Sequence, residues 1–585
     1  MSADSSSRIG TGSLPVILLA AVVQGASLLW LHLAADNQRW PATKPAWLLG
    51  FYAIAVFVPL TAQLIAAHLR ERYAWYVLAA LAGAFFYFGW YHGSNLVVEE
   101  PRRVLQLWQA MPGAFVLALL WLLTVPFIQA RLIEGRWRAR YEVLFSTAWN
   151  NKLVLAEAAL FTGLFWLLLL LWQELFGMLG IPFFKELFDE PTFVYPVTSL
   201  TFGIALHLIG SLERLTQTIL EQLLNVLKWL ALLAGFILAL FTVALVLKLP
   251  GMIASGERAI GAAWLLWLLA VTVLLLNAAY RDGSTERPYP ALIAKSLRYV
   301  TPLTLIIALT AIYALYLRID RYGLTVSRVW ACVVAGALVL YSIGYSLTSL
   351  RSARWMAGIA AVNVRVALLL IVVLASAFTP ILSPYRLSAA SQFRIAQRLD
   401  VAPDDSVFQY LRYELGRYGT AKLTELTQLV DHPRAQQLQA AAKRALEQPS
   451  RGVPGKPPSG AQLAARFVIF PAGREVDGVL LRQLENDIAS PAVAWMFAGT
   501  DRIGAVFIDL DGDSVEEFVL VADARAVGYR RMSDRWHSIG HLAPSGASRQ
   551  GVAGEAVANG AVTAESAKWK DLKVGDRLYR FVGQQ

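Results

Sequence analysis

The residues with the clearest chemistry are four acidic side chains that recur between two apolar runs near the C-terminal end. They stand at positions 1, 3, 5 and 9 of one short stretch, as Asp509, Asp511, Asp513 and Glu517. Calcium takes about six to eight oxygen ligands, and a tight loop can converge alternate side chains with one backbone carbonyl, here that of Val515. The sequence therefore predicts a calcium-binding loop between two strands, as in calcium-stabilised β-repeats.

The same stretch has a second interpretation, a turn rich in Asp and Gly whose carboxylates bond its own backbone N–H groups. It departs from an EF-hand, because Ser514 replaces the glycine expected at position 6 and no glutamate stands at position 12. Nearby carboxylates repel one another unless a cation lies between them, which favours metal binding. Nothing in the stretch favours a catalytic role.

Polar side chains inside the apolar runs are the next candidates, because ionisable groups are costly in lipid and often functional. They are Glu157, His207, Asn277, Asn363 and Arg365. Glu157 lies about one turn from Lys152 near a helix end, where a long side chain can reach the interface. His207 is central in a short run and is read equally well as a packing or a functional histidine. Together these residues form no recognisable proton relay or ion site.

Familiar catalytic signatures are absent from the sequence. It contains no P-loop, GxSxG, HExxH or nucleotide-binding glycine motif. Cys332 is the one cysteine, so a disulfide within the chain, a CxxC redox pair and a cysteine zinc site are excluded. The sequence favours a non-enzymatic protein. A membrane enzyme acting on lipid-linked substrates would have to use loop acids such as Asp36, Glu99 and Glu100.

These candidates belong to a chain whose composition fits lipid. Of its 585 residues, 57% are hydrophobic and 16% are charged, and the mean hydropathy is +0.50. A helix of about 20 apolar residues crosses a bilayer, so the lipid bilayer is the predicted partner. The predicted fold class is a multi-pass α-helical membrane bundle followed by a soluble α+β domain. About eleven transmembrane helices are expected, at 14–34, 47–68, 74–92, 111–130, 153–174, 196–212, 226–247, 259–280, 301–317, 328–349 and 360–382.

The distribution of charge predicts the orientation of these helices. If the N-terminus is cytoplasmic, the segments on that side carry 16 Lys and Arg residues and those on the other side carry 10, the bias of an inner-membrane protein. Eleven crossings then place the C-terminal domain in the periplasm. The basic excess lies in the membrane part, where 27 Lys and Arg stand against 18 Asp and Glu, so nucleic-acid binding is not expected.

The composition changes near Pro384 and predicts four regions. Residues 1–382 are the membrane domain, and 383–448 are a helical segment with one helix from Asp404 to Tyr418 and others at 421–430 and 435–448. Residues 449–460, rich in Pro and Gly, are a linker. Residues 461–585 are the small α+β domain. Within the membrane domain, Glu213–Asn225 has one apolar stripe and is expected to be helical, lying along the membrane surface or against other helices.

Three stretches resemble a known family of bacterial membrane proteins. They are Trp149–Phe193, Tyr313–Arg328 and Tyr410–Gly419, and together they resemble the inner-membrane family called domain of unknown function 4153. The most specific piece is Tyr-Gly-Leu-Thr followed by Arg, at 322–328. The resemblance implies a multi-pass protein of the bacterial inner membrane, and it implies no activity, substrate or catalytic residue.

The specific piece lies between the ninth and tenth predicted helices. Its region contains Arg318, Asp320, Arg321, Tyr322, Gly323, Thr325 and Arg328. Gly323 permits a left-handed turn, and Thr325 can cap the next helix. A cation in a first turn opposes the helix dipole, so Arg328 is expected to pair with a carboxylate, and Asp320 is nearest in sequence. The segment is either a structural clamp or a contact for a ligand or lipid headgroup.

The sequence as a whole favours a membrane protein that presents a periplasmic domain for sensing or binding, with calcium as its predicted cofactor. Two alternatives stay open. A transporter or channel would need a water-accessible cavity that reaches Glu157 or His207. A membrane enzyme would need a lateral groove for its substrate. The residues identify no protein partner.

Overall fold

The structure is a computed structural model that describes most of the chain. The described residues are 14–96, 107–255, 261–283, 289–351, 356, 358–399, 405–448, 463–488, 503–522, 525–532, 535–542, 557, 572–574 and 577–579. The predicted linker at 449–460 and the loop acids Glu99 and Glu100 lie outside them. The chain forms two compact units, Met1–Leu438 and Gln439–Gln585, and the division falls within α17 (Ala435–Glu447).

The first unit is a bundle of long apolar helices. Eleven spans among its described residues are long and apolar enough to cross a membrane, which confirms the predicted fold class. Large apolar side chains such as Leu168, Phe236 and Leu247 are exposed on the outer faces. Lipid is the solvent that suits both such faces and helices whose backbone groups are bonded internally. The chain is therefore a multi-pass membrane protein, and this unit is called the membrane unit.

The order of helices in the membrane unit follows the sequence prediction, and α10 and α11 together make the ninth span. The elements are α1 (Leu14–Asp36), α2 (Pro45–Leu64), η2 (Ala66–His68), α3 (Arg72–Gly93), α4 (Leu107–Glu134), α5 (Tyr141–Met178), α6 (Phe183–Asp189), α7 (Pro191–Ser211), α8 (Glu213–Ser255), α9 (Ala262–Tyr280), α10 (Ala291–Val300), α11 (Leu303–Tyr322), α12 (Val326–Arg351) and α13 (Ile359–Ala377).

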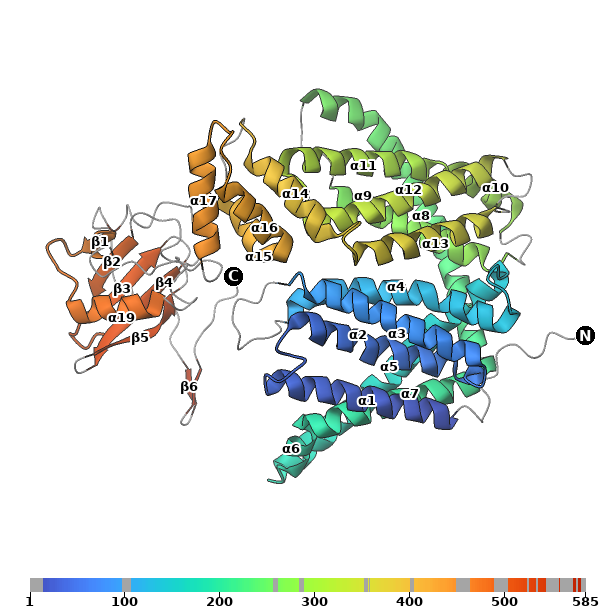
Figure 1. The fold of residues 1–585 in the computed structure, drawn as a ribbon, viewed down its shortest axis with the longest axis horizontal. Coiled ribbons are helices and arrows are strands. Elements are labelled where there is room, and N and C mark those ends of the chain that lie inside the picture. The colour runs from blue at the N-terminus through green and yellow to red at the C-terminus, as the bar shows by residue number, and fades with distance from the viewer. Residues whose placement is uncertain are drawn as a thin grey trace, which may run out of the picture. The chain divides into compact units, whose positions relative to one another are not determined.

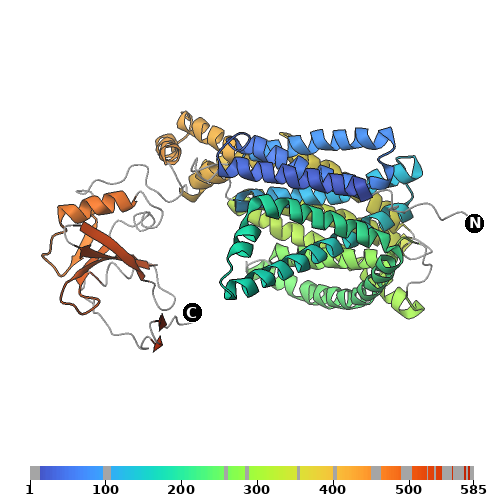
Figure 2. The ribbon, with the colours of Figure 1, turned by 90° about the horizontal axis from the view of Figure 1, so that it is seen from below.

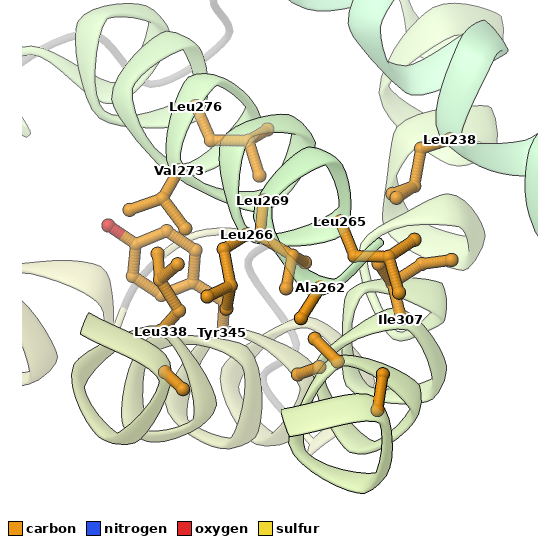
Figure 3. Close-up of a cluster of buried hydrophobic side chains, with 14 of the residues drawn as sticks. Leu238, Ala262, Leu265, Leu266, Leu269, Val273, Leu276, Ile307, Leu338 and Tyr345 are labelled. Carbon is orange, nitrogen blue, oxygen red and sulfur yellow. The ribbon is translucent and has the colours of Figure 1, made fainter. Parts of the chain in front are cut away.

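The two largest apolar cores of the bundle share α13, and smaller clusters lie between other helices. One of the two large cores lies between α2, α3, α4 and α13 and includes Phe57, Trp121 and Leu374. The other lies between α8, α9, α11, α12 and α13, where Leu269 and Ile307 are fully buried (Figure 3). Because lipid tails are as apolar as leucine, these cores stabilise the bundle by close packing rather than by excluding water.

Two helices are much longer than a membrane crossing requires. α5 has 38 residues and α8 has 43, whereas about 20 suffice to cross the hydrocarbon core. The stretch Glu213–Asn225 is helical as predicted, but it is the first part of α8 rather than an interfacial segment between two membrane helices. It contains no proline and no glycine before Gly235, so nothing ends the helix before it enters the seventh span.

Three helices that follow the last span belong to the membrane unit. They are α14 (Pro384–Ala396), α15 (Asp405–Glu414) and α16 (Gly416–Thr427). Figure 1 shows them at the end of the bundle away from α10, and Figure 2 shows the same end from below. The prediction of one helix from Asp404 to Tyr418 is wrong, because the helix is interrupted between Glu414 and Gly416, where Gly416 has a φ of +52°. A Cβ there would overlap the carbonyl oxygen of Asn95, so glycine permits this close approach to the end of α3.

The second unit has the predicted α+β fold. Its sheet has the order β1-β2-β3-β4-β5, with β1 parallel to β2 and the other pairs antiparallel. Leu480 packs with Phe518 on one face, and Val519 packs with Val506 and Val557 on the other, so β3 is buried on both sides. A separate pair is formed by β6 and β7. The elements are β1 (Phe467–Phe470), α19 (Gly478–Ile488), β2 (Ile503–Ile508), β3 (Glu517–Ala522), β4 (Arg525–Met532), β5 (Arg535–Leu542), β6 (Leu572–Val574) and β7 (Arg577–Tyr579).

Candidate functional site

The first candidate site is the connection between α11 and α12, residues 322–328. Gly323 ends α11 with a φ of +71°, the left-handed turn that the sequence predicts. The Thr325 hydroxyl accepts the N–H of Arg328 at 3.4 Å, a long bond for an N-cap. The Arg328 guanidinium donates to the carbonyls of Tyr322 at 3.2 Å and Gly323 at 2.6 Å. The turn is therefore closed by its own arginine.

The expected pairing of Arg328 with Asp320 is wrong. Asp320 pairs instead with Arg398, with 3.8 Å between Oδ1 and Nη2, and Arg398 also donates to the Asp320 carbonyl at 2.8 Å. Arg328 finds its negative charge in the carbonyls at the C-terminal end of α11, which carry the negative end of that helix dipole. The dipole of α11 thus offsets the unfavourable dipole of α12.

Side chains of α14 and α15 complete the hydrogen bonding of this connection. The Ser391 hydroxyl accepts the N–H of Leu324 at 2.8 Å, and the Tyr410 hydroxyl accepts the N–H of Val326 at 2.9 Å. The Gln392 amide donates to two carbonyls of the connection, at 2.9 and 3.1 Å. Buried backbone groups must find partners, and here these partners come from helices far along the chain.

A second contact joins α14 and α16 to the end of α3. The hydroxyls of Tyr418 and Tyr91 are 2.9 Å apart, and the Arg417 guanidinium lies over both rings, 5.0 and 5.2 Å from their centroids. The imidazole of His92 is buried, and its Nδ1 lies 3.3 Å from the Tyr385 hydroxyl of α14. The docking surface, as we call it, comprises residues 322–328 and the end of α3 together with the faces of α14–α16 that contact them.

Two tyrosines of this surface, Tyr385 and Tyr410, have raised pKa values. Burial raises the pKa of the Tyr385 phenol and also that of the Tyr410 phenol. Both hydroxyls therefore keep their protons at neutral pH, and a neutral phenol can donate as well as accept a hydrogen bond. Charge at the surface comes from its arginines and from the Glu414 carboxylate, which adds to the rise in the pKa of both phenols.

The remaining sequence candidates of this region are exposed. Arg318 and Arg321 face outward, and the Arg321 guanidinium lies 5.3 Å from the centroid of the Tyr322 ring. Sequence reasoning missed Ser391 and Gln392, which have no local signature. Tyr410 carries one signal, because it opens a family-like stretch and its partner lies in another, at 322–328.

Two of the amide candidates meet inside the membrane unit. Asn363 of α13 donates to Asn277 of α9 at 2.7 Å and to the Tyr141 hydroxyl of α5 at 2.8 Å. Tyr141 donates to Asn277 at 3.1 Å, and Tyr345 of α12 donates to Asn363 at 2.6 Å. Since the four side chains bond one another, the cluster is typical of a polar link between membrane helices. The tyrosines gave no sequence signal, because tyrosine is common near the ends of membrane helices.

The other membrane candidates are not joined to this cluster by a hydrogen bond among the described residues. Arg365 is exposed and Glu157 is half-buried, while Nδ1 of His207 is a buried atom without a described hydrogen-bond partner. A cavity of about 10 Å³ lies beside Tyr345 and Thr301. That volume has room for one water molecule.

The second candidate site is the acidic loop, residues 509–517, which connects β2 to β3. Asp509 accepts the N–H groups of Gly512 at 2.7 Å and Ser514 at 2.9 Å. Asp511 accepts the N–H of Asp513 at 3.2 Å, and Asp513 accepts the N–H of Val515 at 2.8 Å. Gly512 and Ser514 turn the chain with φ values of +79° and +69°. The loop therefore bonds its own backbone, as the second interpretation of the sequence predicts.

Carboxylate oxygens of the acidic loop also converge. Oxygens of Asp509, Asp511 and Glu517 lie within 4.8 Å of one another. Arg530 of β4 pairs with Asp511 at 2.8 Å, with Asp513, and with Glu517 at 3.8 Å. Glu517 begins the central strand β3 and is only 1% exposed. Sequence reasoning missed Arg530, which reaches the loop only through the pairing of β3 with β4.

Comparison of the chain with models of protein families, with curated proteins and with solved structures finds no match. The docking surface and the acidic loop are therefore interpreted from their own geometry and charge.

Proposed function

We propose that this chain is a receptor-like protein of the bacterial inner membrane, of the kind that its family-like stretches resemble. In this proposal the C-terminal unit binds a ligand in the periplasm. Through the docking surface, a change in the position of α14–α16 alters the conformation of the membrane helices α11 and α12. The protein acts by binding and conformational coupling rather than by catalysis.

The observation that carries the proposal is the connection at 322–328, whose backbone is bonded by side chains of α14 and α15. Helices that merely linked the last membrane span to the C-terminal unit would need no such contact. Each of these hydrogen bonds contributes about 1 kcal/mol net, and a buried group that loses its partner costs more. A movement of α14 or α15 must therefore change the hydrogen bonding at the start of α12.

The direction of the helices supports a periplasmic docking surface. α3 ends and α12 begins at this surface, because Tyr385 contacts His92 and Tyr410 contacts Val326. Helices α4 and α12 each run from it toward the opposite end of the bundle. They end there with basic residues in the last turn, Arg131 and Arg351. Arg and Lys concentrate in short cytoplasmic segments, so the opposite end is expected to be cytoplasmic.

Reporter fusions to the C-terminus of the full-length chain test the side of the membrane. Alkaline phosphatase needs disulfides and becomes active only in the periplasm, whereas green fluorescent protein exported in unfolded form does not fluoresce there. We expect phosphatase activity without fluorescence. Fluorescence without phosphatase activity would put the C-terminal unit in the cytoplasm and contradict the proposal.

Cys332 offers a reporter for the coupling, since it is the single cysteine and is exposed on α12. It lies about two turns after Val326. A bimane label on Cys332 is expected to shift its emission in Gln392→Ala, which removes two hydrogen bonds to the connection. The matched control is Gln428→Ala, which removes an exposed glutamine near the end of α16 and should leave the emission unchanged. Identical spectra for Gln392→Ala and the wild type would contradict the coupling.

A further inference from the structure

The acidic loop holds more carboxylate oxygens than its fold uses. The backbone bonds engage both oxygens of Asp509 and the Oδ1 atoms of Asp511 and Asp513. Glu517 Oε2 accepts a backbone N–H at 2.8 Å. Three oxygens remain: Oδ2 of Asp511, Oδ2 of Asp513 and Oε1 of Glu517. All three face one group, the guanidinium of Arg530.

Glu517 is the least satisfied member of this group. Its side chain is 2% exposed, its Oε1 is buried without a hydrogen bond, and the Arg530 Nε lies 3.8 Å away, which is longer than a hydrogen bond. The sheet imposes this position, because Glu517 pairs with Ile508 of β2 at the start of the central strand. A buried carboxylate oxygen without a hydrogen bond is costly, and Oε1 faces the same guanidinium that pairs with Asp511 and Asp513.

One guanidinium does not neutralise the loop. At neutral pH the four carboxylates of Asp509, Asp511, Asp513 and Glu517 contribute −4 and Arg530 contributes +1, which leaves −3. The neighbouring arginines are engaged elsewhere, because Arg474 pairs with Glu516, and Arg531 lies 3.7 Å from Asp477. Among the described residues, the loop therefore carries uncompensated negative charge around a buried oxygen.

We propose that the acidic loop binds one divalent cation with the oxygen-ligand chemistry of calcium, and that Arg530 is the internal counter-ion that this cation displaces. The three remaining oxygens are ligands, together with water and an oxygen of Asp509, whose carboxylate converges with those of Asp511 and Glu517; Asp513 reaches the same point through Arg530. The backbone bonds that shape the loop use other oxygens or other lone pairs. The loop therefore keeps its fold when the cation replaces the guanidinium, and a dication offers twice the positive charge at one point.

Equilibrium dialysis of the full-length chain in detergent against radioactive calcium, after chelator treatment, tests the site. We expect one calcium ion per chain and a rise in melting temperature. Asp511→Asn should weaken binding at least about tenfold, because it removes one charged ligand. Absence of binding to the wild type at millimolar calcium would overturn the proposal.

The matched control is Glu516→Gln, which removes the same charge from the same loop. The Glu516 carboxylate pairs with Arg474 rather than with the converging oxygens, so calcium affinity should stay within about twofold of the wild type. If both variants weaken binding equally, calcium responds to net charge alone, and the assigned site is wrong.

Arg530→Gln tests the displaced counter-ion. Without calcium this variant should melt at a lower temperature than the wild type, because the loop then has no cation at all. Calcium should restore its stability, and its affinity should exceed that of the wild type at least about tenfold, since no positive charge competes. Arg530→Lys keeps one positive charge, so its calcium affinity should lie between those of the wild type and Arg530→Gln. Unchanged or weaker affinity in Arg530→Gln would overturn the role of Arg530.

Discussion

The α11–α12 connection and the acidic loop are both short turns, but they satisfy their polar groups in opposite ways. Besides its own Thr325 and Arg328, the connection bonds its backbone to side chains that lie 67 to 84 residues further along the chain. The acidic loop bonds its backbone to its own aspartates, two to five residues away. The first turn is completed from outside, by side chains of other helices, and the second from within, by side chains of its own residues.

This difference assigns different roles to the two turns. A turn that takes part of its hydrogen bonding from distant side chains loses those bonds when the side chains move, so the connection is suited to reporting the position of α14 and α15. A turn completed from within is independent of other helices, and the carboxylate oxygens that its backbone does not use face Arg530, which a bound cation would replace. Coupling therefore belongs to the first turn and ligand binding to the second.

The largest loss of stability is expected from Gly416→Ala, which disrupts the packing of the docking surface. Gly416 combines a φ of +52° with a Cβ position that overlaps the Asn95 carbonyl. Strain and overlap together should lower the unfolding free energy of the membrane unit by about 3 kcal/mol, measured by thermal unfolding in detergent. The control Gly180→Ala has a φ of +76° but nothing within 4 Å of the added Cβ, and should cost about 1 kcal/mol. Equal losses would mean that backbone strain, not docking, explains the effect.

Asp509→Ala should destabilise the C-terminal unit and leave the connection unaffected. The carboxylate accepts two backbone N–H groups, and hydrogen bonds to a charged acceptor are strong, so we expect a loss of about 2 kcal/mol by calorimetry. Glu475→Ala, which removes an exposed carboxylate, should change stability by less than about 0.5 kcal/mol. Faster hydrogen exchange at 322–328 in Asp509→Ala would break the distinction between the two turns.

Tyr410→Phe removes one external partner of the connection and little volume. The Val326 N–H then lacks its acceptor, so the membrane unit should lose about 1 kcal/mol of unfolding free energy. Tyr313→Phe, at an exposed position on α11, serves as the control and should have no measurable effect on the melting temperature. A similar loss in both variants would contradict a specific role for Tyr410.

The smallest effect is expected from Thr325→Ala. The Thr325 hydroxyl accepts the Arg328 N–H at a long 3.4 Å, so its removal should cost about 0.5 kcal/mol, the low end for an N-cap. Thermal unfolding beside Tyr410→Phe gives the comparison. A larger loss in Thr325→Ala than in Tyr410→Phe would mean that local capping, rather than docking from outside, holds the connection.

The eleven spans were predictable because each helix must be apolar over its own length to cross lipid. The strands around the acidic loop were predictable for a similar local reason, since alternate and β-branched residues favour a sheet. Even the self-bonded turn follows from its Asp and Gly residues. Signals of this kind lie within the segment that they describe.

Partners that are distant in sequence were not predictable. Asp320 is the nearest acid to Arg328 in sequence, yet Asp320 pairs with Arg398 in space. Ser391 and Gln392 are ordinary helix residues until α14 meets the connection. Arg530 reaches the acidic loop only because Tyr529 pairs with Phe518, next to Glu517. Such contacts depend on tertiary packing, which one sequence does not encode in any local pattern.

Hydrogen–deuterium exchange of the connection tests the central claim most directly, that α14 and α15 hold its backbone. In the wild type, the amides of Leu324 and Val326 should exchange slowly, because each has a side-chain acceptor. In the double variant Ser391→Ala/Tyr410→Phe they should exchange at least about tenfold faster, while peptides from the acidic loop exchange as in the wild type. Equal exchange of the connection in both proteins would contradict the account.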